Sequence, residues 1–397
     1  MNFRSVLFVL LFLMGVSSVA QKRDTIYGQV KSIREELTFL DQSRQNKKLW
    51  RSEGDYGHYG FTSARFTKGR FHSWWYHTPW VHYLNYYKEF SEDNKVLKEI
   101  WYYKSQDTLR YREFEYTDFG KVAKQKEIRY RTSTTTYTYD THQNLVRTKT
   151  VDDKGNIDTK LITYTPDHKV ARTTYFDTED TDEIDVHEHY YDEKGNLISI
   201  KKYNECGESY GTLYEYDAKG RKVNRKYHSP FIKVKKDDDF YSKRAEGGWD
   251  RLDEAYFYDE KDRIIQVNSY RENYEPLNTV ALNYKRKMNY TDGLLSSMYI
   301  YQWNDTISSY SLYTYDDEKR RTKLQVFMPQ FPKNNRESTY TYLKDAFPSQ
   351  LLYKEGGEEV IVTFDYVFDE KNNWIQQTKS INGTPLYVWK RKLEYYD

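Results

Sequence analysis

A short pattern that recurs along most of the chain constrains its fold more than any other feature. The segment TLYEYDAKGRKV, Thr212 to Val223, places two tyrosines at alternate positions, then an aspartate, and three residues later a glycine. Alternating apolar and polar residues predict a half-buried β-strand. The aspartate favours a turn, and the glycine supplies the positive φ that a tight hairpin loop requires. The segment therefore predicts one β-hairpin.

The pattern returns at intervals of about 25 residues from Ser91 onward. It predicts turn aspartates at Asp118, Asp140, Asp167, Asp192, Asp217, Asp259, Asp292, Asp316, Asp345 and Asp369. The residues singled out for a structural role in these turns are Asp192, Gly195, Asp217, Gly220, Asp259 and Asp369. Further turn signals lie halfway between, such as DDKGN at Asp152 and EGGEE at Glu355. Turns this frequent predict an all-β fold, an antiparallel meander of about twenty strands built from β-hairpin repeats.

The number of strands also limits the shape of the sheet. Open sheets twist and curl beyond about ten strands. One face of the predicted strands carries the tyrosine pairs, and the other carries mainly Thr, Glu, Lys and Arg. We therefore expect a curled or spiral sheet with the tyrosine face inward, shell-like or barrel-like if it closes.

Composition excludes several classes of protein. The chain has 62 basic and 60 acidic residues, a balance that argues against a nucleic-acid partner. With Cys206 as the single cysteine, neither an intramolecular disulfide nor a cysteine-based metal site can form. The 42 tyrosines and 9 tryptophans supply the apolar material, and tyrosine favours strands. No cofactor and no metal ion are expected.

The first twenty residues have the order of regions found in a signal peptide. Arg4 provides positive charge, Val6 to Val16 is an apolar run, and Ser18-Val19-Ala20 fits a cleavage site. The apolar run is shorter than the roughly 20 residues that span a bilayer. The expected mature chain, residues 21–397, is one exported domain without a transmembrane anchor. Its location is periplasmic, cell-surface or secreted.

The recurring pattern Y-x-Y-D-x-x-G-[NR]-[LIV] resembles the YD repeat, also called the RHS repeat. The matching positions are Tyr191-Asp192 with Gly195, Tyr216-Asp217 with Gly220, and Tyr258-Asp259 with Asp262. The resemblance covers roughly residues 85 to 397. It implies a spiralling β-sheet shell, which in that family encloses a toxin domain or belongs to a surface or adhesion protein.

The chain departs from the large toxin shells of that family. Several loops place Gln143, Asp262, Lys319 or Asn372 where the repeat has glycine. No glycine-rich core motif follows the repeats, and the last predicted strand reaches Asp397. The resemblance therefore implies a small, stand-alone exported member without a toxin domain.

An aromatic insertion, residues 42–80, interrupts the pattern early. Trp74, Trp75, His77 and Trp80 stand together in it, beside Pro79, and are the candidate ligand-binding residues. One interpretation is a surface on which sugar rings stack, because long loops in compact domains are often functional. The other is a cap that covers the first edge of the sheet and buries the rings.

A second interruption, residues 228–250, contains a Lys-Lys-Asp-Asp-Asp run, Pro230 and two adjacent glycines. These features predict an irregular, solvated loop. His187 and His189 share one strand face, but spacing fixes no further ligand, so a metal site is not expected there.

The motifs G-x-S-x-G and H-E-x-x-H are absent, and so are phosphate-binding glycine loops. Repeat arrays tend to present extended binding faces. We therefore expect an exported scaffold that binds an envelope or extracellular ligand, a glycan or a protein, without catalysis. One alternative is a carbohydrate-active enzyme that uses a pair of carboxylates. The other is a relative of the toxin-shell proteins.

Overall fold

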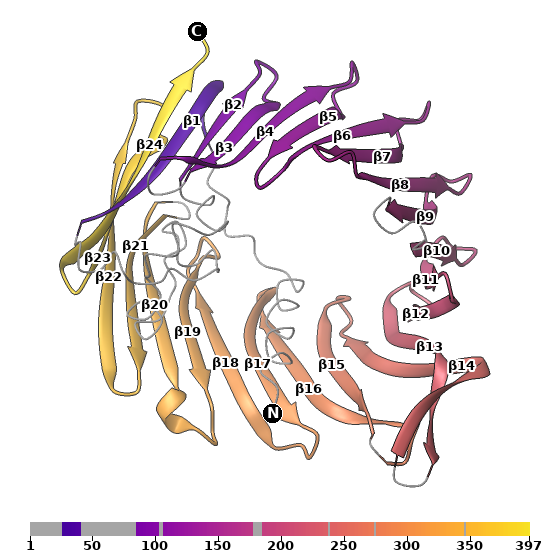
Figure 1. Ribbon diagram of the computed structural model, residues 1–397. Coiled ribbons are helices and arrows are strands. Elements are labelled where there is room, and N and C mark those ends of the chain that lie inside the picture. The colour runs from indigo at the N-terminus through magenta and orange to yellow at the C-terminus, as the bar shows by residue number, and fades with distance from the viewer. Residues whose placement is uncertain are drawn as a thin grey trace. The chain divides into compact units, whose positions relative to one another are not determined.

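The computed structural model describes residues 26–40, 85–102, 106–177, 185–236, 239–273, 275–344 and 347–397. These residues form consecutive strands and one short 3-10 helix, η6 (Pro332–Asn334) (Figure 1). The first strands are β1 (Val30–Phe39), β2 (Tyr86–Phe90), β3 (Val96–Tyr102), β4 (Thr108–Tyr116), β5 (Val122–Ile128), β6 (Thr132–Tyr139), β7 (Leu145–Asp152), β8 (Ile157–Tyr164), β9 (Val170–Asp177), β10 (Asp185–Tyr191), β11 (Leu197–Asn204) and β12 (Gly207–Tyr216).

The remaining strands continue the series to the C-terminus. They are β13 (Lys222–Lys236), β14 (Asp239–Tyr258), β15 (Ile264–Glu272), β16 (Val280–Thr291), β17 (Leu294–Gln302), β18 (Ile307–Tyr315), β19 (Arg321–Phe327), β20 (Arg336–Lys344), β21 (Phe347–Glu355), β22 (Glu358–Phe368), β23 (Trp374–Ile381) and β24 (Thr384–Tyr395). Within the ranges described, no helix is long and apolar enough to cross a membrane.

The chain divides into two compact units. The first holds the described residues of Met1–Leu109, with Asn289–Met298 and Ser309–Asp397, and the second holds Arg110–Met288 and Tyr299–Ser308. In each unit consecutive strands pair antiparallel, as in β6 with β7 and β21 with β22. In the first unit β1 also pairs antiparallel with β24 (Figure 1). The predicted all-β antiparallel meander is confirmed, with somewhat more strands than the twenty or so expected.

The turn at Asp192 shows why the repeat has its sequence. The N–H of Gly195 donates to the carbonyl of Asp192 at 2.9 Å, and the N–H of Asp192 donates to the carbonyl of Asn196 at 3.0 Å. Gly195 has φ +80°, and the strand register shifts beside it. This is a type I turn followed by a left-handed residue in a β-bulge, a favoured hairpin connection.

The aspartate side chain closes the same turn. Asp192 accepts hydrogen bonds from the backbone N–H of Asn196 at 2.8 Å and from its side-chain amide at 2.9 Å. In the turn of Asp217, Arg221 donates to the carboxylate from its backbone N–H and its Nε. The repeat has either Asn or Arg in the position after the glycine. Both residues are suited to it, because the side chain of each can donate a hydrogen bond to the carboxylate of the turn aspartate.

Four of the predicted turn residues are aspartates in equivalent positions, and we call them the turn aspartates: Asp192, Asp217, Asp259 and Asp369. Hydrogen bonds within the turns of Asp192, Asp217 and Asp259 lower the pKa of each carboxyl. Burial raises the pKa of Asp369, but hydrogen bonds from Tyr395, Asn373 and the backbone outweigh it. Each turn is therefore held best with its aspartate ionised.

Two predicted turn positions are shifted by one or two residues. Thr117 and Thr165 occupy the turn position near Asp118 and Asp167, and each accepts a hydrogen bond from a backbone N–H through its hydroxyl. Threonine can replace aspartate here because its hydroxyl makes the same short-range bond. Asp345 lies outside the described residues.

In many repeats the tyrosine just before the turn connects successive hairpins. The hydroxyl of Tyr216, for example, donates to the carbonyl of Leu197 at 2.9 Å, at the start of the preceding return strand. The same contact joins Tyr139 to Val122, Tyr164 to Leu145, Tyr191 to Val170, Tyr258 to Lys222, Tyr315 to Leu295 and Tyr342 to Arg321. A phenylalanine could fill this position but could not make this bond.

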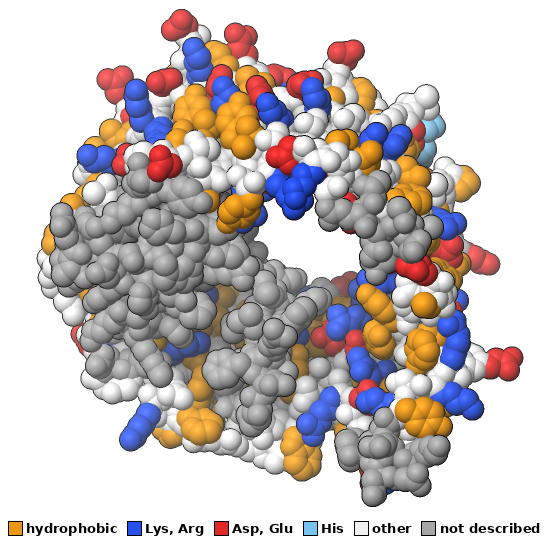
Figure 2. Space-filling model, viewed as in Figure 1, with side chains coloured by type: hydrophobic (Ala, Val, Ile, Leu, Met, Phe, Trp, Pro, Cys, Tyr) orange, Lys and Arg blue, Asp and Glu red, His pale blue; other side chains and the backbone are white. Residues whose placement is uncertain are grey.

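The tyrosine face is buried in the first unit but not throughout the second. Tyr340, Tyr353 and Phe364 belong to a buried cluster on β20, β21 and β22. In the second unit Tyr175 and Tyr210, on the same face, remain 36% and 39% exposed. The tyrosine face of the second unit is therefore only partly buried. Figure 2 shows basic and acidic side chains interspersed over the visible surface.

The described residues 228–236 and 239–250 are not an irregular loop. They belong to β13 and β14, which pair along most of their length. The register shifts at Pro230, and the opposing Gly247 and Gly248 have positive φ, so these residues form a bulge inside a hairpin. Proline is tolerated in strands at such bulges. Lys235, Lys236 and Asp239 of the charged run lie in the paired ends of the two strands, although their charges suggested a longer loop.

Candidate functional site

The predicted ligand-binding residues Trp74, Trp75, His77 and Trp80 lie outside the described residues, as do the whole insertion 42–80 and the signal segment 1–20. Whether the insertion is a cap or a binding surface stays a prediction. The predicted turn residues Asp192, Gly195, Asp217, Gly220, Asp259 and Asp369 lie in four separate hairpin turns. They therefore form no common site.

An open groove of about 680 Å³ lies in the first unit, beside η6. This volume is in the range of small-ligand sites, roughly 300–1,000 Å³. The groove is lined by Gln325, Phe327, Pro332, Lys333, Asn335, Arg336, Glu337, Lys354, Gly356 and Gly357. Strand alternation puts Gln325 and Glu337 on the face opposite the buried Tyr340, so the groove belongs to the outer side of this unit's core.

Local structure fixes the position of the groove wall. Pro332 opens η6, where its fixed φ suits the first helical position. Asn335 ends the segment and accepts a hydrogen bond from the N–H of Met328 through its side-chain oxygen at 2.7 Å. At the other side Gly356 and Gly357, with φ +61° and +83°, form the tight turn between β21 and β22.

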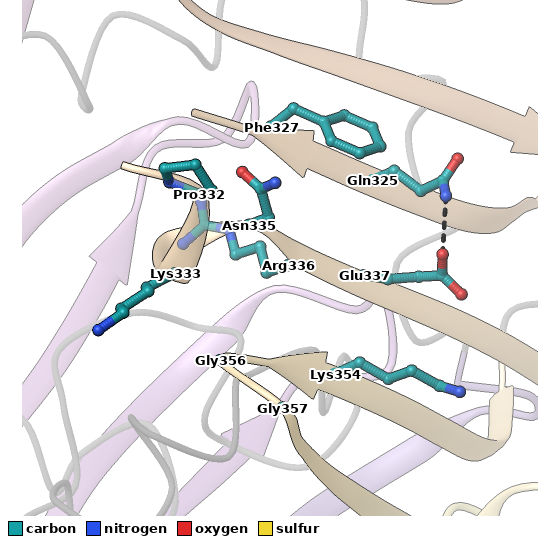
Figure 3. A pocket seen from close by; sticks show the side chains of 10 residues that line it. All are labelled: Gln325, Phe327, Pro332, Lys333, Asn335, Arg336, Glu337, Lys354, Gly356 and Gly357. Carbon is teal, nitrogen blue, oxygen red and sulfur yellow. Dashed lines mark hydrogen bonds between the residues drawn. The ribbon is translucent and has the colours of Figure 1, made fainter. Parts of the chain in front are cut away.

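A row of polar side chains crosses the floor of the groove. Gln325 of β19, Glu337 of β20 and Lys354 of β21 stand opposite one another in register. Figure 3 shows the Gln325 amide facing Glu337, with the Phe327 ring next along β19. The amide donates to the carboxylate at 2.7 Å. The Phe327 ring is stacked on that of Tyr310, with ring centroids 4.6 Å apart.

Among the lining residues whose side chains the structure describes, Glu337 is the one carboxylate. Burial raises its pKa, but hydrogen bonds from Lys323 and Gln325 outweigh burial and leave the pKa below its usual value. The Lys323 ammonium lies 3.0 Å from the carboxylate. An ionised, hydrogen-bonded carboxylate can accept bonds from ligand hydroxyls. It is poorly suited to the general-acid role in glycoside hydrolysis, which needs a raised pKa and a second carboxylate.

The sequence did not reveal this groove. Its residues come from three strands and two turns, and only the strand register brings them together. The available signal was the break in the tyrosine pattern at MPQFPKNNRE, from Met328, followed by the diglycine of EGGEE.

A buried charged cluster occupies the tyrosine face of the same unit. The Arg391 guanidinium lies 2.6 Å from the Glu35 carboxylate, and both side chains are almost fully buried. The guanidinium also stacks over the Trp374 ring, 3.8 Å from its centroid. Lys379, 1% exposed, lies next to the rings of Phe364 and Tyr387. Because buried charges are costly without such partners, this cluster depends on the pairing of β1 with β24.

The histidines of β10 show no ligand cluster. Burial lowers the pKa of His187 and of His189, so both imidazoles are neutral near pH 7. In the part of the chain that the structure describes, no three or more His, Cys, Asp or Glu side chains are placed to hold a metal ion.

Comparison with known proteins gives weak likenesses. No family model matches the sequence, and no curated protein matches it significantly. A crystal structure of TcdB2-TccC3-Cdc42 aligns with 79% of this chain at 11% identity and a TM-score of 0.31. The alignment spans 20% of that protein's length.

Porin-like proteins also align with this chain. The protein from Bacteroides uniformis aligns with 72% of this chain and 96% of its own length, at 11% identity and a TM-score of 0.21. The one from Bacteroides vulgatus aligns with 74% and 95%, at 13% identity and a TM-score of 0.16. At these TM-scores the likenesses assign neither a family nor a function.

Proposed function

We propose that the protein is an exported repeat scaffold that binds an envelope or extracellular ligand, a glycan or a protein, without catalysing a reaction. The observation that most supports binding is the groove beside η6. Export is supported by the charged, apolar and small-residue regions of residues 1–20. The compartment that follows is periplasmic, cell-surface or secreted.

The lining of the groove suits a hydroxylated ligand. Gln325 and Asn335 offer amide groups, and Phe327 offers an aromatic ring for apolar contact. Lys333, Arg336 and Lys354 line the same groove as Glu337, so both donors and acceptors are present. Ligand sites commonly combine aromatic surface with a few polar groups that set orientation.

Binding without catalysis is supported by the state of Glu337. Its carboxylate is held by Lys323 and Gln325, and its pKa lies below the usual value, whereas the general acid of a glycosidase needs a raised pKa. A relationship to YD-repeat proteins is also part of this proposal. It is supported by the turns at Asp192 and Asp217, where the glycine at the repeat position has φ near +80°.

The test is a binding screen of the purified mature protein against glycans and envelope polymers. A double variant, Gln325→Ala with Phe327→Ala, is expected to weaken binding at the groove by about tenfold or more. The matched control is Gln350→Ala, on the same face of β21 but away from the groove. Equal binding by the double variant and the control contradicts a role for the groove.

A further inference from the structure

A continuous line of aromatic and polar side chains crosses the tyrosine face of the second unit, perpendicular to its strands. We call it the tyrosine row. From β6 to β14, one strand after another, its members are Tyr137, Thr148, Lys160, Tyr175, His187, Lys202, Tyr210, Tyr227 and Arg251.

Strand register aligns most of the row. Tyr137 stands opposite Thr148, Thr148 opposite Lys160, and Lys160 opposite Tyr175. Further along, Lys202 stands opposite both His187 and Tyr210.

The last members of the row continue the line. Tyr227 stands opposite Arg251. At two places neighbouring members are not directly opposite in register, but their rings are in contact. The ring centroids are 5.4 Å apart for Tyr175 and His187 and 5.9 Å apart for Tyr210 and Tyr227. The row therefore crosses nine adjacent strands without a break.

Three tyrosines of the row are spaced three strands apart, and Tyr227 on β13 stacks on the last of them. Tyr137 lies on β6, Tyr175 on β9 and Tyr210 on β12. With neighbouring strands about 4.8 Å apart, successive rings are about 14 Å apart. Tyr175 and Tyr210 are 36% and 39% exposed. Rings at this spacing can contact an extended polymer at regular intervals, every few sugar units.

Charges of both signs accompany the rings and neutralise one another. Arg251 lies 3.1 Å from Asp253 and 3.7 Å from Glu272. Asp185, opposite Tyr175, lies 3.2 Å from His187. Asp185, Asp253 and Glu272 equal in number the basic Lys160, Lys202 and Arg251 of the row. The row and these flanking acids together therefore carry no excess positive charge that would attract a polyanion.

The same side chains supply donors and acceptors for hydroxyl groups. Beside Tyr175 lies a pocket of about 290 Å³, close to the lower end of ligand-site volumes. Thr148, Lys160 and Asp185 are among the residues that line it.

We infer that the tyrosine row binds a linear, uncharged polysaccharide that lies across the strands, with sugar rings against Tyr175 and Tyr210. The inference deepens the proposed function, on which it rests, by naming the ligand class and a second site away from the groove. Flat aromatic rings suit the apolar faces of sugars, and the balanced polar groups suit their hydroxyls.

The experiment measures binding of linear neutral glucan oligosaccharides to the mature protein by calorimetry. The double variant Tyr175→Ala with Tyr210→Ala is expected to weaken binding by roughly tenfold per ring, as for aromatic anchors. The matched control, Tyr190→Ala with Phe257→Ala, removes two rings of similar exposure from the opposite face, and binding should be unchanged.

The possible results distinguish failure of the tyrosine-row inference from failure of the proposed function. Glucan binding that survives loss of Tyr175 and Tyr210, or that is lost in the control, overturns the row while leaving the proposed function intact. Absence of glucan binding by the wild type, or preference for a polyanion or a protein, also overturns it. Absence of any ligand in the wider screen instead contradicts the proposed function.

A second measurement needs no variant. In hydroxyl-radical footprinting of the wild type, a saturating glucan should protect Tyr175 and Tyr210 and leave Tyr190 and Phe257 reactive. If glucan does not lower the reactivity of Tyr175 and Tyr210, the inference is contradicted. This result does not depend on whether the alanine variants fold.

Discussion

Gly220 provides a direct test of the turn that the repeat encodes. Its φ is +79°, in the left-handed region that side chains disfavour. A Cβ added there would meet only the Asn196 side-chain oxygen, at 3.9 Å, which is an ordinary contact. The cost of Gly220→Val therefore comes from the backbone alone, about 1–2 kcal/mol with the upper end for a β-branched residue.

The chain itself supplies the control. Asn372 occupies the equivalent turn position with φ +70°. Asparagine tolerates this conformation through local hydrogen bonds, so Gly220→Asn should cost less than about 1 kcal/mol.

Urea unfolding followed by circular dichroism measures both variants. With a denaturant slope of about 3 kcal/mol/M, the Val variant should unfold about 0.3–0.7 M earlier than the wild type. The reasoning about positive φ is refuted if Gly220→Val unfolds at the wild-type midpoint, or if the Val and Asn variants are equally destabilised.

Other predictions concern the tyrosine hydrogen bonds that connect successive hairpins, the buried charged cluster, the turn aspartates and the insertion 42–80. Tyr216→Phe should cost about 1 kcal/mol in urea unfolding, because one hydrogen bond is lost, and no change would show that bond to be irrelevant. Arg391→Met should cost about 3–5 kcal/mol by leaving Glu35 buried without its partner; a cost below 1 kcal/mol would contradict a structural role. Since the turn aspartates have pKa values below the usual 3.8, their stabilisation is present above about pH 4 and lost as pH falls further, so urea midpoints that stay constant on acidification would contradict their role. Alanine at Trp74 and Trp75 should cost about 3–5 kcal/mol each if the insertion is a cap, whereas an intact fold with lost glycan binding would identify a ligand surface.

Local chemistry was predictable from the sequence because its partners are near in the chain. Asp192 and Gly195 form their turn with residues no more than four positions away. Positive φ at Asp262 and Asn372, where glycine is missing, followed from the repeat position alone. The repeat and its turns were therefore readable without knowledge of the tertiary fold.

Contacts that depend on register between strands were not predictable. Spacing does not reveal that Tyr216 reaches the carbonyl of Leu197, or that Glu35 pairs with Arg391 from the far end of the chain. The groove and the tyrosine row are set by register in the same way. Pro230 and its neighbouring charges misled the prediction. Proline and clustered charges are typical of loops, but proline also occurs where a strand contains a β-bulge.

The central claim, binding without catalysis, is tested most directly by incubating the mature protein with each glycan that it binds and recovering that glycan for mass spectrometry. We predict saturable binding and recovery of the glycan with unchanged length and linkage after prolonged incubation. Shortened or rearranged glycan would contradict the claim and identify an enzyme. Failure to bind any glycan, envelope polymer or envelope protein would contradict the scaffold itself.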